Sequence, residues 1–246
     1  ILAALQSNGW LDGLDALITG YMPSVRHVEV VARALVRMAD EMPDLLYLCD
    51  PVIGDDPDGL FVRAEVADAI RDQLVPLADI VTPNRMELAW LTGQPVTDCA
   101  SADAASGMFG GDLVVAATSI PSGAGQLANL LSTEDDACYT STPWRGGVPH
   151  GTGDLFAALL LGHMLNGADD RESLARAAAG VGQVILASIG AVELKLFDTL
   201  DAATSANPLP LFEVDDDDDP SMDPRSNSEA DAGPANGPGP APDKAT

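Results

Sequence analysis

The chain has 246 residues, 46% of them hydrophobic, which is enough for one sizeable folded core. Its formal net charge of −26 gives a surface that repels polyanions, so we expect neither a nucleic-acid partner nor an anionic membrane partner. Its three cysteines lack CxxC spacing and no apolar run reaches membrane-spanning length, which excludes a disulfide framework and favours a cytoplasmic protein.

The two ends of the chain differ in composition from the part between them. Residues 212–246 contain a run of aspartates and a Pro-, Gly- and Ser-rich stretch, which cannot bury enough apolar surface to fold. We therefore predict a folded domain at residues 1–211 and a disordered acidic tail at residues 212–246. The chain begins at Ile1 within an apparent helix, and we expect an upstream portion to be missing.

The folded part alternates apolar strands with amphipathic helices. Strands are predicted at residues 14–20, 45–50, 78–82 and 112–117, with helices between them at 25–42, 64–74 and 85–92. An antiparallel pair at 126–131 and 137–140 follows, and helices at 154–165 and 171–189 close the domain. Continuously apolar strands that alternate with helices predict an α/β fold with a parallel sheet covered on both faces.

Polar residues follow the predicted strands where each strand ends. In open α/β sheets, ligands bind outside the carboxyl ends of the strands, so these residues are expected to share one rim. They are Thr19, Gly20, Tyr21, Asp50, Asp55, Thr82, Asn84, Glu87, Thr118 and Ser119.

The segment Gly151-Thr152-Gly153-Asp154 indicates a glycine turn that opens a buried helix. Unpaired backbone N–H groups and the helix dipole favour an anion at such a turn. Asp154 would repel a phosphate, so it suggests a base that takes a proton from a hydroxyl about to be phosphorylated. A match this short also arises by chance, and the helix dipole alone favours an acid at this position. Only the residues around the turn can distinguish a catalytic base from an acid that merely stabilises the helix.

Four blocks carry a resemblance to a known family. They are Thr19-Gly20-Tyr21, residues 49–55 (CDPVIGD), residues 76–87 (PLADIVTPNRME) and residues 151–158 (GTGDLFAA). In this order they resemble the ribokinase-like kinases, and among them the pyridoxal kinases, over roughly residues 11–191. The resemblance implies a three-layer αβα ribokinase-like fold with a mostly parallel central sheet. The first strands and the substrate lid of that fold would precede Leu11 and are expected to be missing.

The resemblance also implies an ATP-dependent phosphorylation of the primary hydroxyl of pyridoxal and related B6 vitamers, in vitamin B6 salvage. Asp154 would be the general base, Tyr21 would face the pyridoxal ring, and the family is commonly homodimeric. The anion hole would consist of Gly151, Thr152 and Gly153. ATP would contact Asp50, Asn84, Glu87, Thr118 and Ser119. Glu87 would help to hold Mg²⁺, and Asp55 with Thr82 would lie near a monovalent cation, K⁺ or Na⁺.

Alternatives remain open at this point. Asn84 and Glu87 also form a capping-box-like helix start, and Asp50 is also a strand-end turn former. Arg85 and Arg145 could each meet a phosphate. The function could instead be that of a hydroxymethylpyrimidine kinase or a sugar kinase of the same superfamily, or of a non-catalytic nucleotide-binding fragment. Hydroxymethylpyrimidine kinases often carry Cys where Asp154 stands.

Overall fold

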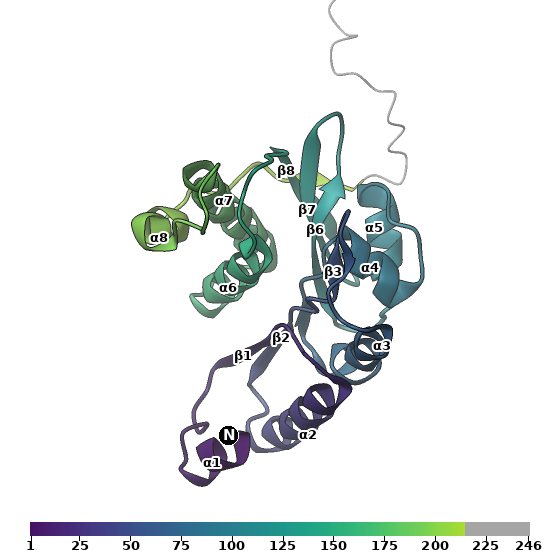
Figure 1. The fold of residues 1–246 in the computed structure, drawn as a ribbon, viewed down its shortest axis with the longest axis vertical. Coiled ribbons are helices and arrows are strands. Elements are labelled where there is room, and N and C mark those ends of the chain that lie inside the picture. The colour runs from purple at the N-terminus through teal and green to yellow at the C-terminus, as the bar shows by residue number, and fades with distance from the viewer. Residues whose placement is uncertain (215–246) are drawn as a thin grey trace, which may run out of the picture. The chain divides into compact units, whose positions relative to one another are not determined.

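The computed structural model describes residues 1–214 of the chain (Figure 1). Most of the predicted tail, residues 215–246, lies outside the described residues. Its first residues, Phe212 and Glu213, form strand β9, which pairs with Tyr139 and Cys138 and so belongs to the sheet. No helix within residues 1–214 is long and apolar enough to cross a membrane.

A seven-stranded sheet in the order β1-β2-β5-β6-β7-β8-β9 forms the centre of the fold. Its strands are β1 (Ala16–Thr19), β2 (Leu46–Cys49), β5 (Ile80–Val81), β6 (Val114–Pro121), β7 (Gln126–Ser132), β8 (Ala137–Pro143) and β9 (Phe212–Glu213). The first four strands are parallel, and β7, β8 and β9 are each antiparallel to their neighbours. Only β7 and β9 therefore run against the other described strands, which confirms the mostly parallel sheet.

Helices cover both faces of this sheet, as Figure 1 shows. One face carries α2 (Val25–Glu41), α3 (Ala64–Gln73), α4 (Arg85–Thr92) and α5 (Cys99–Ser106). The other carries α6 (Thr152–Leu165) and α7 (Asp170–Ser188), with α8 (Leu196–Thr204) packed against α7. The three layers confirm the predicted αβα architecture.

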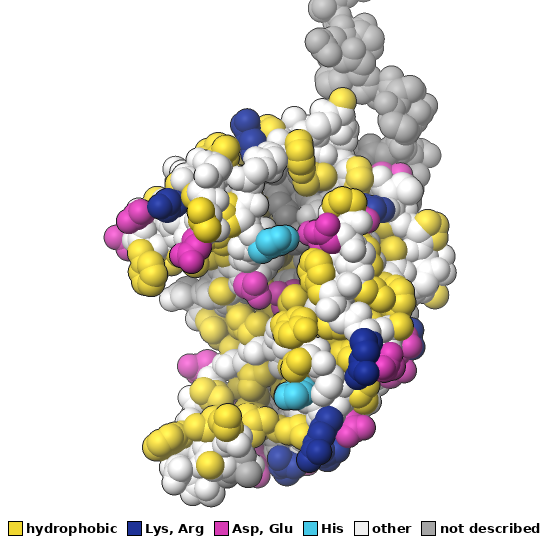
Figure 2. Space-filling model, in the orientation of Figure 1, with side chains coloured by type: hydrophobic (Ala, Val, Ile, Leu, Met, Phe, Trp, Pro, Cys, Tyr) yellow, Lys and Arg dark blue, Asp and Glu magenta, His cyan; other side chains and the backbone are white. Residues whose placement is uncertain are grey.

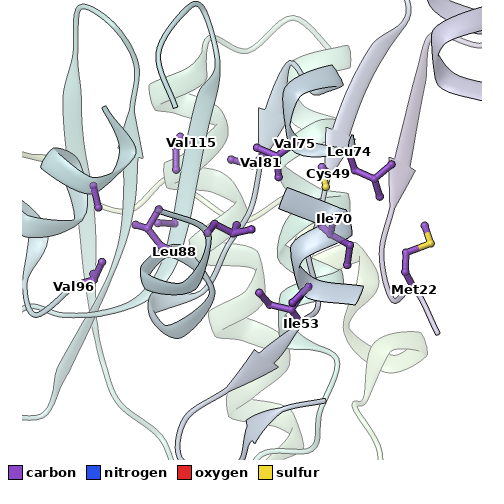
Figure 3. Close-up of a cluster of buried hydrophobic side chains, with 14 of the residues drawn as sticks. Met22, Cys49, Ile53, Ile70, Leu74, Val75, Val81, Leu88, Val96 and Val115 are labelled. Carbon is purple, nitrogen blue, oxygen red and sulfur yellow. The ribbon is translucent and has the colours of Figure 1, made fainter. Parts of the chain in front are cut away.

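Alternation along the strands explains the two buried faces. Cys49 and Val81 point into the cluster beneath α2–α5, whereas their neighbours Leu48 and Ile80 point into the cluster beneath α6 and α7. Both faces of β2 and β5 are therefore apolar, as in other covered parallel sheets. Figure 3 shows part of the first cluster, where Cys49, Val81 and Leu88 are among the labelled side chains.

Several short elements were not predicted from the sequence. They are the hairpin of β3 (Gly54–Asp55) and β4 (Gly59–Leu60), the 3₁₀ turn Val75–Leu77, α5 and α8. A six-residue helix, α1 (Leu2–Ser7), precedes β1. Among these elements the hairpin has the greatest bearing on ligand binding, because it borders the carboxyl edge of the parallel strands.

Candidate active site

Most of the polar residues predicted at the strand ends line one cavity of about 760 Å³, whereas Thr19, Gly20 and Tyr21 at the end of β1 do not. This volume is in the range of pockets that hold a cofactor or a small substrate. Figure 2 shows a hollow on the face in view, with acidic side chains and a histidine at its rim. The predicted site residues that line the cavity are Asp50, Asp55, Thr82, Asn84, Glu87, Thr118, Ser119, Gly151, Thr152, Gly153 and Asp154.

The glycine turn is open to the cavity. Gly151 is the N-cap residue of α6, with a φ of 106° that residues with a side chain rarely adopt. Thr152 and Gly153 begin the helix, where backbone N–H groups have no acceptor within the helix. A Cβ atom placed on Gly153 would meet nothing within 4 Å, so a ligand can approach the main chain. The turn can therefore hold an anion through its backbone.

Asp154 stands beside this anion site in the first turn of α6. Its side chain is exposed, so a substrate hydroxyl can reach the carboxylate. A Cβ atom placed on Gly20, directly after β1, would lie 3.8 Å from Asp154 Oδ1 and 3.9 Å from Val52 Cγ2. The end of β1 therefore lies beside Asp154, and a Cβ atom at Gly20 would be in ordinary van der Waals contact with the carboxylate.

Asp50 directly follows β2 and is only 6% exposed. Burial raises the pKa of Asp50 to about 8, and repulsion by Glu87 and Asp154 adds to this rise. An interaction with the Thr82 hydroxyl opposes the rise only in part. Thr82 Oγ1 is itself buried and has no hydrogen-bond partner of standard geometry among the described residues. These two side chains therefore present oxygen atoms that a proton or a cation would stabilise.

Glu87 is 3% exposed and accepts hydrogen bonds from three backbone amides. Its Oε1 accepts from Ile53 N at 2.8 Å and Gly54 N at 3.3 Å, and its Oε2 accepts from Asn84 N at 2.9 Å. Asn84 Oδ1 accepts in turn from Glu87 N at 2.9 Å, which completes a capping box at the start of α4. Burial still raises the pKa of Glu87 to about 7, although these hydrogen bonds oppose the rise. The helix-start interpretation of both residues is confirmed.

Two residues beside the cavity adopt backbone conformations that are rare outside glycine. Val52 has a φ of 44° and Ser119 a φ of 60°. Val52 is β-branched, so this conformation is strained. Ser119 lies within an irregularity of the β6–β7 pairing between Ala117 and Ile120. Strain of this kind concentrates at binding sites, where the surrounding structure enforces a fixed backbone.

Three predicted contacts have different outcomes. Tyr21 is 56% exposed and does not line the cavity, so its contact with a substrate ring stays a prediction. Arg85 does not line the cavity either, and its guanidinium pairs with Asp56. Arg145 does line it, and it is the only Arg or Lys among the lining residues of the described chain.

The cavity also has an apolar part that the sequence did not reveal. Leu127 of β7, Trp144 after β8 and Leu186 of α7 contribute to it. Trp144 is 64% exposed, which is unusual for so large an apolar side chain and typical of a binding surface. Leu127 and Leu186 lie in patterns that also fit core positions, so the sequence carried no signal that separated them.

The geometry combines three chemical capacities in one cavity. The start of α6 can bind an anion, the buried carboxyl groups can bind cations, and the apolar part can hold a ring. Six carboxylates line the cavity with a single arginine, so a polyphosphate can enter only together with a cation. The exposed Asp154 beside the anion site is placed to accept a proton from a hydroxyl.

Comparisons with known proteins agree with this geometry. The sequence profile of the phosphomethylpyrimidine kinase family matches residues 10–195. The pyridoxal kinase PdxY of Corynebacterium diphtheriae is 32% identical over 221 residues, which are 87% of this chain and 78% of that protein.

Solved structures give the same result. The pyridoxal kinase of Entamoeba histolytica superimposes with a TM-score of 0.80 at 25% identity, covering 87% of this chain and 77% of that one. The pyridoxal kinase of Leishmania donovani, in complex with ADP and pyridoxamine, has a TM-score of 0.77 at 26% identity and covers 85% and 77%. This chain therefore belongs to the pyridoxal kinases, which share the ribokinase-like fold.

Proposed function

We propose that this chain transfers the γ-phosphoryl group of ATP to the primary hydroxyl of pyridoxal and related B6 vitamers, which yields pyridoxal 5′-phosphate. The observation that carries the proposal is the exposed carboxylate of Asp154 in the first turn of α6, beside an open glycine start of that helix. Phosphoryl transfer needs a positioned hydroxyl and stabilised charge on the transferring group. This turn offers a group for each need.

In this proposal the residues of the turn have two roles, proton acceptance and stabilisation of negative charge. Asp154 accepts the proton of the attacking hydroxyl and so fixes the direction of that oxygen. The backbone N–H groups of Gly151, Thr152 and Gly153 hold the charge that develops on the transferring phosphoryl group. Arg145, which has no ion pair among the described residues, adds a cation on the same cavity.

The residues present fit a magnesium ion that is shared with the nucleotide. No group of three or more His, Cys, Asp or Glu side chains within the described residues could hold a metal ion alone. Mg²⁺ commonly binds through one or two carboxylates together with substrate phosphates and water. Asp50 and Glu87 would supply the carboxylates, and bound Mg²⁺ would neutralise the phosphates. The buried hydroxyl of Thr82, which has no hydrogen-bond partner of standard geometry among the described residues, would hold the monovalent cation together with Asp55.

The remaining ATP contacts are inferred from the lining of the cavity. Asn84, Thr118 and Ser119 would donate to phosphate oxygens, since all three line the cavity, Asn84 shortly after β5 and the other two within β6. The apolar part around Trp144 and Leu186 has the character of surfaces that hold a nucleobase. Tyr21 would meet the substrate ring from outside this lining.

We also propose a cytoplasmic homodimer. None of the cysteines at positions 49, 99 and 138 forms a disulfide, and all three are buried, which supports a reducing compartment. Val192, in the loop before α8, and Phe197, in the first turn of α8, are fully or almost fully exposed, and such apolar surface supports self-association. Light scattering after size-exclusion chromatography would give the mass, and a monomer at micromolar concentration would contradict the dimer.

Asp154→Asn tests the central assignment. We expect turnover of pyridoxal to fall about 10²- to 10⁴-fold, because the amide cannot accept the proton. Binding of ATP should not weaken, since the substitution keeps the shape of the side chain and removes a negative charge that repels the polyphosphate. Isothermal titration with ATP and a coupled assay for pyridoxal 5′-phosphate give the two values. Retained turnover would remove Asp154 from the role of base.

The substrate is tested separately with a panel. The family profile carries the description phosphomethylpyrimidine kinase, so hydroxymethylpyrimidine is the competing acceptor, and ribose represents the sugar kinases. We expect the highest kcat/KM on pyridoxal. Phosphorylation of hydroxymethylpyrimidine in preference to every B6 vitamer would contradict the proposal, and nucleotide binding without turnover of any acceptor would favour a non-catalytic chain.

A further inference from the structure

The β3–β4 hairpin forms one wall of the cavity and rests on the first turn of α4. Its turn contributes Asp56 and Asp58 to the lining. Its base is held firmly, since Asn84 Nδ2 donates to Gly54 O at 2.7 Å and Glu87 Oε1 accepts from Gly54 N at 3.3 Å. The position of the hairpin therefore depends on α4 at its base, and a different contact must hold its turn.

Arg85 supplies that second contact. Its Nη2 donates to Asp56 Oδ2, and its Nη1 donates to Val96 O at 3.0 Å. Arg85 is the first residue of α4, where the helix dipole disfavours a cation. The positive charge of Arg85 therefore does not stabilise α4. It links the turn of the hairpin to the loop that comes after α4.

The charge of this contact bears on the cavity. Six carboxylates line the cavity, against Arg145 as the only Arg or Lys lining it in the described chain. The triphosphate of ATP is strongly negative, so each unpaired carboxylate makes binding less favourable. Asp56 is one of the six, and Arg85 pairs with it from outside the lining.

We propose that Arg85 is a positioning residue that acts on the nucleotide through Asp56, whose carboxylate it neutralises so that the acid-lined cavity admits ATP. The proposal rests on the ATP-dependent activity proposed above. It predicts different effects on ATP binding for the loss of Arg85 and for the loss of Asp56. A pair that only held the hairpin would be weakened equally from either side, whereas loss of Arg85 alone leaves an unpaired carboxylate at the cavity.

The test compares four variants by steady-state kinetics with pyridoxal in excess. We expect Arg85→Ala to raise the KM for Mg-ATP about three- to tenfold and to change kcat less than about twofold. Asp56→Asn should have a KM at or below that of wild type, and the double variant should return to within about twofold of wild type. Arg85→Lys, which keeps the charge, should stay close to wild type.

Arg63→Ala is the matched control, because it removes an exposed arginine that pairs with Glu65 and does not line the cavity. A KM for Arg85→Ala equal to that of this control would overturn the proposal. Equal increases for Arg85→Ala and Asp56→Asn would also overturn it, since they would indicate a purely structural pair. The two conservative variants, Arg85→Lys and Asp56→Asn, keep the comparison available where the alanine variant does not fold.

Binding measured without turnover separates this proposal from the proposed function. Isothermal titration with Mg²⁺ and a non-hydrolysable ATP analogue should give the same ratios as dissociation constants. If wild type binds the analogue but phosphorylates no B6 vitamer, the proposed function fails and the ratios still decide the role of Arg85. Wild-type protein that does not bind the analogue would overturn both.

Discussion

Replacing Asp50 with Asn should stabilise the protein in alkaline solution and change its stability much less in acid. Asp50 is 6% exposed, and burial with repulsion from Glu87 and Asp154 raises its pKa to about 8. In an unfolded chain the pKa of an aspartate is about 3.9. The folded protein therefore binds a proton at this carboxyl between these two values, and the unfolded chain does not.

The sign of the effect is set by proton linkage. A group whose pKa is raised by folding stabilises the native state fully below its unfolded pKa, and this contribution is lost as the pH rises through the folded pKa. Four pKa units correspond to about 6 kcal/mol at most, because each unit is worth about 1.4 kcal/mol. Water in the cavity screens the charge, so we expect about 2–4 kcal/mol of free energy of unfolding. Asp50→Asn removes this loss, because an amide does not ionise.

Urea unfolding at about pH 5 and about pH 8.5 measures the difference. Asp50→Asn should be the more stable protein at the higher pH, and the difference between the two proteins should be much smaller at the lower pH. Asp98→Asn is the control, because hydrogen bonds at the start of α5 lower the pKa of Asp98, so that its stabilising contribution is complete at both pH values. This variant should be less stable than wild type by a similar amount at each pH. Parallel curves for wild type and Asp50→Asn would refute the argument.

The raised pKa of Asp50 also predicts how many protons are released when Mg-ATP binds. If a cation binds at Asp50, it displaces the proton that the empty protein holds near neutral pH. Titration of Mg-ATP in two buffers with different ionisation enthalpies should then reveal proton release for wild type. Asp50→Asn should release less, and equal release from both proteins would place the cation away from Asp50.

Two further substitutions test packing and capping. Gly180→Ala should cost about 1–3 kcal/mol in urea unfolding, because its Cβ would lie 2.5 Å from Ala203 O of α8. Gly182→Ala, which meets nothing within 4 Å on the same helix, should instead gain up to about 1 kcal/mol, and equal effects would contradict the packing argument. Asn84→Ala should cost about 1–2 kcal/mol through the lost cap and should also weaken binding of the ATP analogue. Asp98→Ala removes the cap of α5 at a similar cost but should leave that binding unchanged; parallel losses of binding would contradict a role for Asn84 in the site.

The strands and the large helices were predictable because their apolar patterns are local. The residues of β2 are apolar at every position, and burial on both faces demands this. Once the strands were placed, the general rule for ligands in α/β sheets predicted that Asp50, Asn84 and Thr118 would share a rim. Their shared cavity confirms this step.

The elements that escaped prediction carry weaker or misleading patterns. The strands of the β3–β4 hairpin have two residues each, which is too short for any alternation. Helix α8 exposes Phe197 completely, so its apolar residues do not mark a buried face. Helix α5 had one usable signal, the capping box of Asp98 and Ser101 at its start. The contact between Arg85 and Asp56 could not be predicted from the sequence, because the hairpin that supplies Asp56 was itself not predicted.

Glu87 shows why the cap and ligand interpretations of one side chain need not compete. A carboxylate offers about four lone-pair positions, and three backbone amides use only three of them. Oε1 accepts two of these hydrogen bonds, whereas Oε2 accepts only the one from Asn84 N. The remaining position on Oε2 is available to a water of a hydrated cation. The same residue that fixes the start of α4 and the base of the hairpin would then orient Mg²⁺, so the fold of the cavity wall and the chemistry of the site depend on one carboxylate.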